Sequence, residues 1–312
     1  MKQIIQEIRD FIKEEFNIWI YSYTVIFLAI AIILNYTYNF ENAYIDSFYG
    51  KPMGMFIYIP FYGFAYFSIL IPLLIIKKRT YKLKQPEFWV KIITILVIFS
   101  VTIGFYQYYG YIAEYKKNYK EYFYLILVIS NLKRIIPFLI VFYILKRIYD
   151  KDMNHLYGFR YKGINYRPFF VLLAMVMPLI IWASFFKSFQ HSYPQFKFWY
   201  FGNIFGLNTF EKISIFEVAY GLDFVSIELL FRGALIVGMI KVLGKDAILP
   251  MVAMYVFIHF GKPPGECISS FFGGFILGVH SYYRKNIFAG IIIHLGIAYL
   301  MEIAAITQHF LK

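Results

Sequence analysis

The sequence predicts an all-α, polytopic transmembrane helical bundle of about eight to nine spanning helices. The chain of 312 residues is 60% hydrophobic and only 16% charged, with a mean hydropathy of +0.59. A chain of that composition cannot cover a soluble domain with polar groups, so lipid must serve as the solvent. Apolar runs of about 20 residues, the length that crosses the hydrocarbon of a bilayer, also recur along the sequence.

The opening segment predicts an amphipathic helix. Ile4, Ile8, Ile12 and Phe16 recur every four residues with charged residues between them. This spacing places them on one helical face, as in helices that lie in the membrane interface. A solvated lead-in helix is the alternative.

Nine apolar segments follow. The plainer five are expected at Ile18–Tyr36, Phe56–Ile76, Phe88–Gln107, Tyr124–Leu145 and Pro168–Phe186, and the C-terminal four at Ile213–Ile240, Ala247–Phe260, Cys267–Tyr282 and Ile287–Phe310. The second and third of the C-terminal four are short enough to be buried inside the bundle. We expect one continuous membrane domain, with the interfacial helix and four spans in residues 1–166 and a core carrying the polar site in residues 167–312.

The distribution of basic residues predicts the orientation. With the N-terminus in the cytoplasm, the cytoplasmic connections carry 18 Lys and Arg residues and the opposite ones 9. Cytoplasmic loops of membrane proteins carry this excess, so a cytoplasmic N-terminus is favoured.

Charge and cysteine content exclude several classes of function. The single cysteine, Cys267, rules out an intramolecular disulfide and a zinc site built on several thiolates. The net charge of +13 is scattered through short connections without a basic tract, so we expect no nucleic-acid partner. Anionic membrane lipids are the expected partner of these basic residues.

Ionisable residues inside the predicted C-terminal spans are the strongest functional signal, because each costs roughly 2.5–3.5 kcal/mol at the bilayer centre. Glu228 and Arg232 are four residues apart, which puts them on one helical face within ion-pairing reach. His259 and His294 lie in two further apolar segments. Glu266 follows two prolines and is expected near the start of a helix, where a capping role is the simpler reading. A buried structural ion pair and satisfied core histidines are the corresponding simpler readings of the other residues.

These residues resemble the motifs of the CPBP family of intramembrane proteases, which includes the type II CAAX prenyl endopeptidases and proteins linked to bacteriocin processing and immunity. Glu228 to Gly233 matches the family's Glu-Glu-x-x-x-Arg motif except at its first position, which is Ile227. Tyr255 and His259 match the second motif, and His294 matches the third, although Ala298 replaces its polar partner. A glycine-rich segment with Gly273, Gly274 and Gly278 lies between the second and third motifs, as it does in the family.

The resemblance implies a water activated by a carboxylate and His259, with His294 as oxyanion donor and Arg232 fixing Glu228. Ile227 and Ala298 depart from the pattern. Asp223 lies four residues before Ile227 and Glu302 four after Ala298, so each lost polar group has a carboxylate one helical turn away. We hypothesise a site rebuilt with shifted groups; interfacial carboxylates are the alternative.

The sequence therefore favours an intramembrane endopeptidase of CPBP type that hydrolyses peptide bonds of membrane-associated proteins or peptides. A catalytically inactive scaffold or peptide-binding relative, with partners in a membrane complex, is the alternative, and a proton-coupled transporter ranks last. His259, His294 and Glu228 would also make a plausible zinc set, but the resemblance argues for a metal-free site, and we expect no cofactor. The expected location is the bacterial cytoplasmic membrane.

Overall fold

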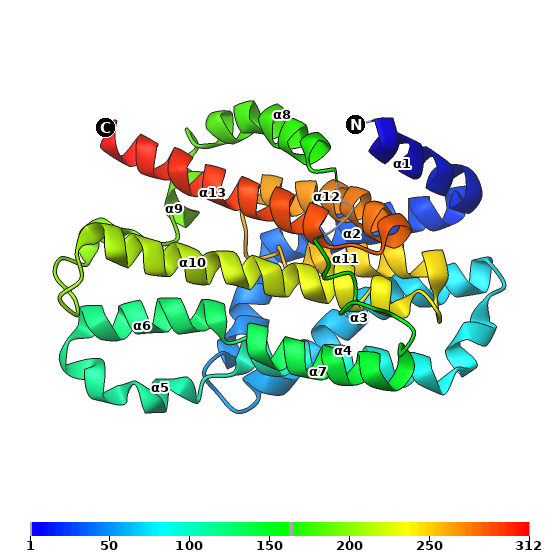
Figure 1. Cartoon of the computed structure of the whole chain (residues 1–312), viewed down its shortest axis with the longest axis horizontal. Helices are drawn as coiled ribbons and strands as arrows, with labels where there is room; N and C mark the ends of the chain where they lie inside the picture. Colours follow the sequence, from blue (N-terminus) through cyan, green and yellow to red (C-terminus); the bar gives the residue numbers. More distant parts are fainter. Residues whose placement is uncertain (1, 162–164, 312) are drawn as a thin grey trace.

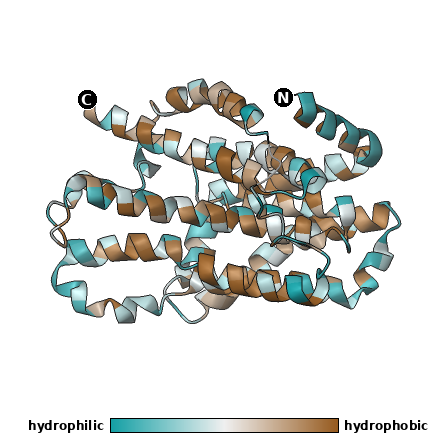
Figure 2. Ribbon diagram, viewed as in Figure 1, coloured by the Kyte–Doolittle hydropathy of each residue, from teal (hydrophilic) through white to brown (hydrophobic). Residues whose placement is uncertain are grey.

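The computed structural model describes residues 2–161 and 165–311. Within them the chain forms helices joined by turns and loops, without β-strands, which confirms the predicted all-α class. Most of the longer helices run along the long axis of the molecule (Figure 1). Apolar residues dominate their middle turns, and polar residues gather at their ends and in the connections (Figure 2). This distribution is the one expected of a protein whose helices cross a bilayer.

The α-helices, in chain order, are α1 Lys2–Glu15, α2 Ile18–Tyr38, α3 Gly54–Ile76, α4 Pro86–Gly104, α5 Tyr108–Tyr111, α6 Tyr119–Leu132, α7 Ile135–Tyr149, α8 Arg167–Ala183, α9 Lys187–Ser192, α10 Thr209–Glu228, α11 Ile248–Phe257, α12 Pro264–Arg284 and α13 Phe288–Phe310. Short 3-10 or π turns, labelled η1 to η8, are Glu41–Ile45, Asp46–Phe48, Thr80–Lys84, Ala113–Lys117, Phe198–Tyr200, Leu229–Ala234, Val237–Met239 and Gly244–Ala247.

Within the described residues, five helical segments are long and apolar enough to cross a membrane. They are Ile18–Tyr38, Gly54–Ile76, Pro86–Tyr111, Tyr119–Tyr149 and Phe288–Phe310. The chain is therefore an integral membrane protein, whereas the count of eight to nine spans stays a prediction.

Two expected spans are not continuous helices. The segment Tyr124–Leu145 is interrupted between α6 and α7, where the Lys133 amine donates to the Ile103 carbonyl and Arg134 forms an ion pair with another helix. The segment Ile213–Ile240 is an α-helix only as far as Glu228 and continues as a π turn. In both places a charged side chain, half-buried at the α6–α7 break and fully buried at Arg232, finds its partner through a local change of helical geometry, which sequence periodicity cannot reveal.

Helix α11 is the centre of the bundle. Every one of its ten residues is buried, and α3 and α12 pack against it. A helix that is apolar on all sides is stable only when protein or lipid surrounds it completely, and α11, at roughly 15 Å, is too short to cross the bilayer. The expectation of burial is thus confirmed for residues 247–257. The other short segment, Cys267–Tyr282, is part of the longer helix α12, in which Ile268 and Phe272 are exposed, so its full burial was wrongly expected.

Helix α1 docks on the bundle instead of extending into solvent. Ile4 and Phe11 are buried, and Ile4 packs with Phe169 of α8 and Ala289 of α13. The buried Glu7 carboxylate accepts hydrogen bonds from His280 Nδ1 (2.7 Å) and Arg284 Nε (2.5 Å), both on α12. Part of the apolar face of α1 therefore packs on the protein, while Ile12 and the following Phe16 stay exposed; the position of α1 in the membrane interface stays a prediction.

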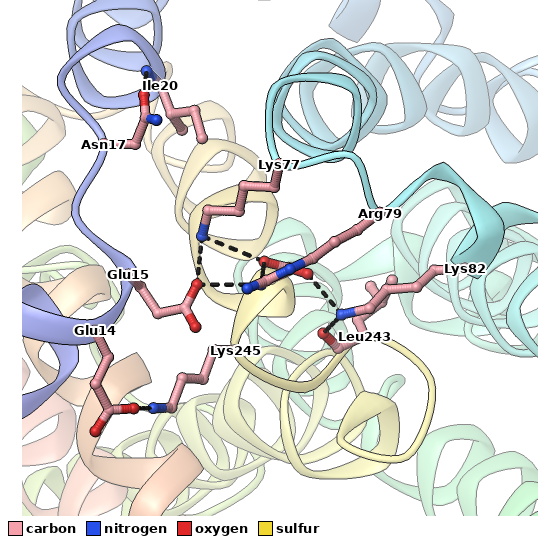
Figure 3. A network of polar contacts seen from close by, with 10 residues as sticks. Glu14, Glu15, Asn17, Ile20, Lys77, Arg79, Lys82, Leu243 and Lys245 are labelled. Atoms are coloured by element: carbon pink, nitrogen blue, oxygen red, sulfur yellow. Dashed lines mark hydrogen bonds and ion pairs between the residues drawn. The ribbon is translucent and has the colours of Figure 1, made fainter.

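An ion-pair network joins the end of α1 to two other parts of the bundle (Figure 3). Asp246, whose side chain is fully buried, accepts from Arg79 (2.8 Å) and Lys82 (2.6 Å), and Lys77 bridges it to Glu15 of α1. Because each carboxylate is shared by more than one cation, the network fixes α1, the end of α3 and the turn before α11 relative to one another.

We predict that docking of α1 depends on the ionised Glu7 carboxylate. Burial alone would raise the pKa of Glu7, but the hydrogen bonds and charges of His280 and Arg284 hold it below the ordinary value of 4.5. Because the pKa of Glu7 is lower in the docked state, the ionised carboxylate stabilises docking above pH 4.5. This stabilisation is lost as the pH falls through the pKa of the docked state. A spin label at Ile12→Cys should be ordered at pH 7 and become mobile in strong acid.

The Glu7→Gln variant should show the mobile spectrum at pH 7. Asp10→Asn is the matched control, because Asp10 accepts only from Gln6 of the same helix among the described contacts. A label that stays ordered in Glu7→Gln at every pH would contradict this account.

Candidate functional site

A buried ion pair stands at the end of α10. The helix starts with a capping box between Asn208 and Glu211 and ends at Glu228, where a π turn places Arg232 over the preceding carboxylate. Arg232 NH1 donates to Glu228 Oε1 at 2.8 Å, and both side chains are fully buried. The pairing expected from the four-residue spacing is confirmed.

His294 of α13 reaches the same carboxylate oxygen. Its Nδ1 lies 3.1 Å from Glu228 Oε1. The approach is close because Gly290, one turn earlier on α13, faces Glu228, and a Cβ at that position would overlap the Glu228 Oε2 oxygen. A glycine is needed here for space and not for backbone conformation.

Helix α11 and the turn after it supply the third wall. The Tyr255 ring lies 4.2 Å from the guanidinium carbon of Arg232, and this cation–π contact covers the Arg232 nitrogens that have no hydrogen-bond partner among the described residues. His259 Nδ1 is 2.7 Å from the Tyr255 carbonyl oxygen, and the rings of His259 and His294 lie 6.5 Å apart. Side chains from α10, α11 and α13 thus meet in one polar cluster.

These contacts orient both imidazoles. A carbonyl oxygen only accepts, so His259 Nδ1 must be the donor, and the neutral ring carries its lone pair on Nε2. His294 Nδ1 likewise donates to the Glu228 carboxylate. Nε2 of each imidazole is therefore not used in these contacts.

Comparison with known families agrees with this geometry. Residues 209–300 match the family described as type II CAAX prenyl endopeptidase, Rce1-like. Over this segment the match supports the resemblance to the CPBP family. The match covers α10 to most of α13 and includes the whole polar cluster. Searches of curated proteins and of solved structures found no significant match.

The two departures from the CPBP motifs are apolar in the structure as well. Ile227 is buried in the large apolar cluster that includes α3, α4 and α11. Ala298 is buried with Phe196 and Tyr220 in a separate cluster. Neither position adds a polar group to the site.

Asp223 has a partner of its own. Arg134, at the break between α6 and α7, donates from Nε to Asp223 Oδ1 (2.7 Å) and from NH2 to Oδ2 (2.5 Å). This bidentate pair joins α10 to the α6–α7 break. The sequence hinted at Arg134 only through its charge within an apolar segment.

Glu266 and Glu302 hold the connection between α8 and α10. Both Glu302 oxygens accept from the backbone N–H of Gln195, at 2.9 and 3.0 Å, and Glu266, in the first turn of α12, accepts from the Tyr193 hydroxyl at 2.8 Å. No sequence pattern marked Tyr193 or Gln195, because their partners are more than 70 residues away. These carboxylates therefore anchor a connection beside the CPBP segment.

The three residues considered as zinc ligands, Glu228, His259 and His294, lie close together, but they are engaged in other contacts. His294 contacts Glu228, and His259 contacts the Tyr255 carbonyl. His294 and Arg232 both use Glu228 Oε1. In the described part of the chain, no three His, Cys, Asp or Glu side chains are grouped so as to hold a metal ion.

We predict that Gly290→Ala disrupts the cluster. The added methyl overlaps Glu228 Oε2 and must displace the carboxylate from Arg232 and His294, at a cost of about 1–3 kcal/mol. Thermal unfolding in detergent should occur at a lower temperature than in the wild type. Gly273→Ala in α12 is the control, since a Cβ there meets nothing within 4 Å; equal unfolding temperatures for the two variants would refute the assigned contact.

Proposed function

We propose that this protein is an intramembrane endopeptidase of the CPBP type, acting on peptide bonds of membrane-associated proteins or peptides. The observation that carries the proposal is the meeting of Glu228, His259 and His294, from three separate helical segments, in one buried polar cluster. The Rce1-like match over the same segment supports it.

His259 is the proposed general base. Glu228 is fully buried and engaged by Arg232 and His294, so its carboxylate is poorly placed to meet a water. His259 is only half-buried, and its Nδ1 is held by the Tyr255 carbonyl, which leaves Nε2 to take a proton from water and return it to the leaving amine. His259 would thus take over the role of the carboxylate that the family motif has at the position of Ile227.

His294 is the proposed oxyanion donor. In this role the ring donates from Nδ1 to the Glu228 carboxylate and from Nε2 to the carbonyl oxygen on which negative charge develops. Arg232 holds Glu228 in position through the buried ion pair. Glu228 and Arg232 are therefore positioning residues, whereas His259 and His294 contact the reacting atoms.

An apolar groove supports the proposal that the substrate carries a lipid modification. A cavity of about 750 Å³ lies between α2 and α3, and Phe257 and Phe260 close its inner side. Phe260 directly follows His259 in the chain. We propose that the groove takes the lipid chain of the substrate while its peptide reaches the polar cluster, in keeping with the prenyl substrates named in the family description.

The remaining parts of the assignment follow from the sequence. We propose a bacterial cytoplasmic membrane with the N-terminus in the cytoplasm, since the predicted cytoplasmic connections carry 18 of the basic residues against 9. The alternative function is an inactive membrane scaffold, which the apolar residues Ile227 and Ala298 favour.

Cleavage should depend on both imidazoles. With a fluorogenic, lipid-anchored peptide in proteoliposomes, His259→Ala and His294→Ala should each lower kcat/KM by about 100-fold or more, because general-base and oxyanion contributions are of that size. Glu228→Gln should cost about tenfold or more, because the amide oxygen can still accept from Arg232 but carries no negative charge to strengthen the hydrogen bond from His294. His309→Ala, near the C-terminus, is the control and should be unchanged.

Wild-type rates in both histidine variants would contradict the catalytic assignment. Absence of turnover in the wild-type protein, tested with peptide libraries that carry varied lipid chains, would favour the scaffold.

Filling the groove should separate lipid recognition from chemistry. Ala31 lines the groove on α2, and Ala31→Trp should raise KM for the lipid-modified peptide by about tenfold while leaving kcat near its wild-type value. Ile33→Trp is the matched control, because Ile33 is exposed on the same helix and does not line the groove. An unchanged KM in Ala31→Trp would remove the groove from the substrate path and leave the catalytic assignment intact.

A further inference from the structure

A second cavity shares no lining residue with the apolar groove. It has a volume of about 450 Å³ and is enclosed by the start of α6 and the connection that runs from α9 through η5. Three basic residues, Lys120, His191 and Lys197, line it together with aromatic rings that include Phe123 and Tyr200. Among the residues that the structure describes, no Asp or Glu lines it.

The charges of this cavity are not neutralised within the described residues. Neither Lys120 nor Lys197 takes part in an ion pair there, and Lys197 Nζ donates only to the His191 carbonyl, at 3.0 Å. The nearest carboxylate in sequence, Glu121, is engaged by the backbone N–H of Phe205. The cavity therefore presents uncompensated positive charge, which favours an anionic ligand.

The wall formed by α6 changes character with depth. Lys120, Phe123 and Leu127 all line the cavity, and their spacing of three and four residues places them on one helical face. Because α6 begins a segment apolar enough to cross the membrane, Lys120 lies near the headgroup level and Leu127 roughly 10 Å deeper. A cation above an apolar wall matches a phosphate group above an acyl chain.

We propose that this cavity binds an anionic glycerophospholipid. The lipid phosphate contacts Lys120, Lys197 and His191, and one acyl chain follows Phe123 and Leu127 along α6. A soluble phosphate ester would use the basic residues but gain nothing from the apolar wall, so the combination of the two selects a lipid. The site is independent of the proposed peptidase activity and shares no residue with the polar cluster.

The bound lipid would also brace the connection between α8 and α10. Gln195 lines the cavity, and its backbone N–H is the group that Glu302 holds against α13. Lipid binding and the Glu302 contact would therefore both hold the short segment around Gln195.

The test is a titration of the purified full-length protein in detergent with dioleoyl phosphatidylglycerol, followed by native mass spectrometry. Replacing both lysines, Lys120→Gln with Lys197→Gln, should weaken binding about 30-fold, the effect of removing two basic residues near an anionic lipid. Phe123→Ala should weaken it several-fold without changing any charge. Dioleoyl phosphatidylcholine should bind weakly to the wild type and be unaffected by the lysine variant.

The matched control is Lys116→Gln with Lys117→Gln, which removes two charges from the neighbouring turn η4, outside the cavity. Equal losses in the two double variants would overturn the proposal in favour of general surface attraction. Unchanged binding in the cavity variant would overturn it as well. Displacement of the lipid by equimolar glycerol 3-phosphate would identify a soluble phosphate ester as the ligand and also reject the lipid.

Discussion

The buried pair of Glu228 and Arg232 is the constraint on which the C-terminal half depends. Burying two charged side chains at membrane depth is costly, and removing one partner would leave the other uncompensated. The Tyr255 ring covers the Arg232 guanidinium, and His294 binds the Glu228 carboxylate. Since these two partners belong to α11 and α13, satisfying one ion pair brings three helices to a common point.

The N-terminal half, which the family match does not cover, holds the backbone next to the polar cluster. Asn35 on α2 donates to the Phe260 carbonyl, and Tyr36 donates to the Lys262 carbonyl. These two bonds hold the backbone of the turn that begins at His259. Helix α3 packs against α11, and α4 packs against α3. The helices outside the CPBP segment therefore act as a frame for its polar cluster.

Local sequence patterns predicted two kinds of site residue: pairs that are neighbours along one helix, and polar residues that lie within apolar runs. Glu228 and Arg232 could be paired from their spacing, and His259 and His294 stood out against hydrophobic runs. The partners of Asp223 and Glu302 could not be predicted, because Arg134 and the Gln195 backbone come from segments about 90 or more residues away. The same holds for the breaks after Glu228 and at Lys133, where tertiary partners override a continuous apolar pattern. Roles for Asp223 and Glu302 in catalysis remain hypotheses, now set beside the structural contacts that each makes.

The enclosure of α11 has a consequence for how the protein is made. A helix of ten residues is recognised poorly as an independent insertion unit, and its backbone ends need protein partners at that depth. Helix α3 is synthesised long before α11, whereas α12 follows it directly. Biogenesis must therefore keep the first part of the bundle open on one side until the α11–α12 hairpin has left the ribosome and closed the gap.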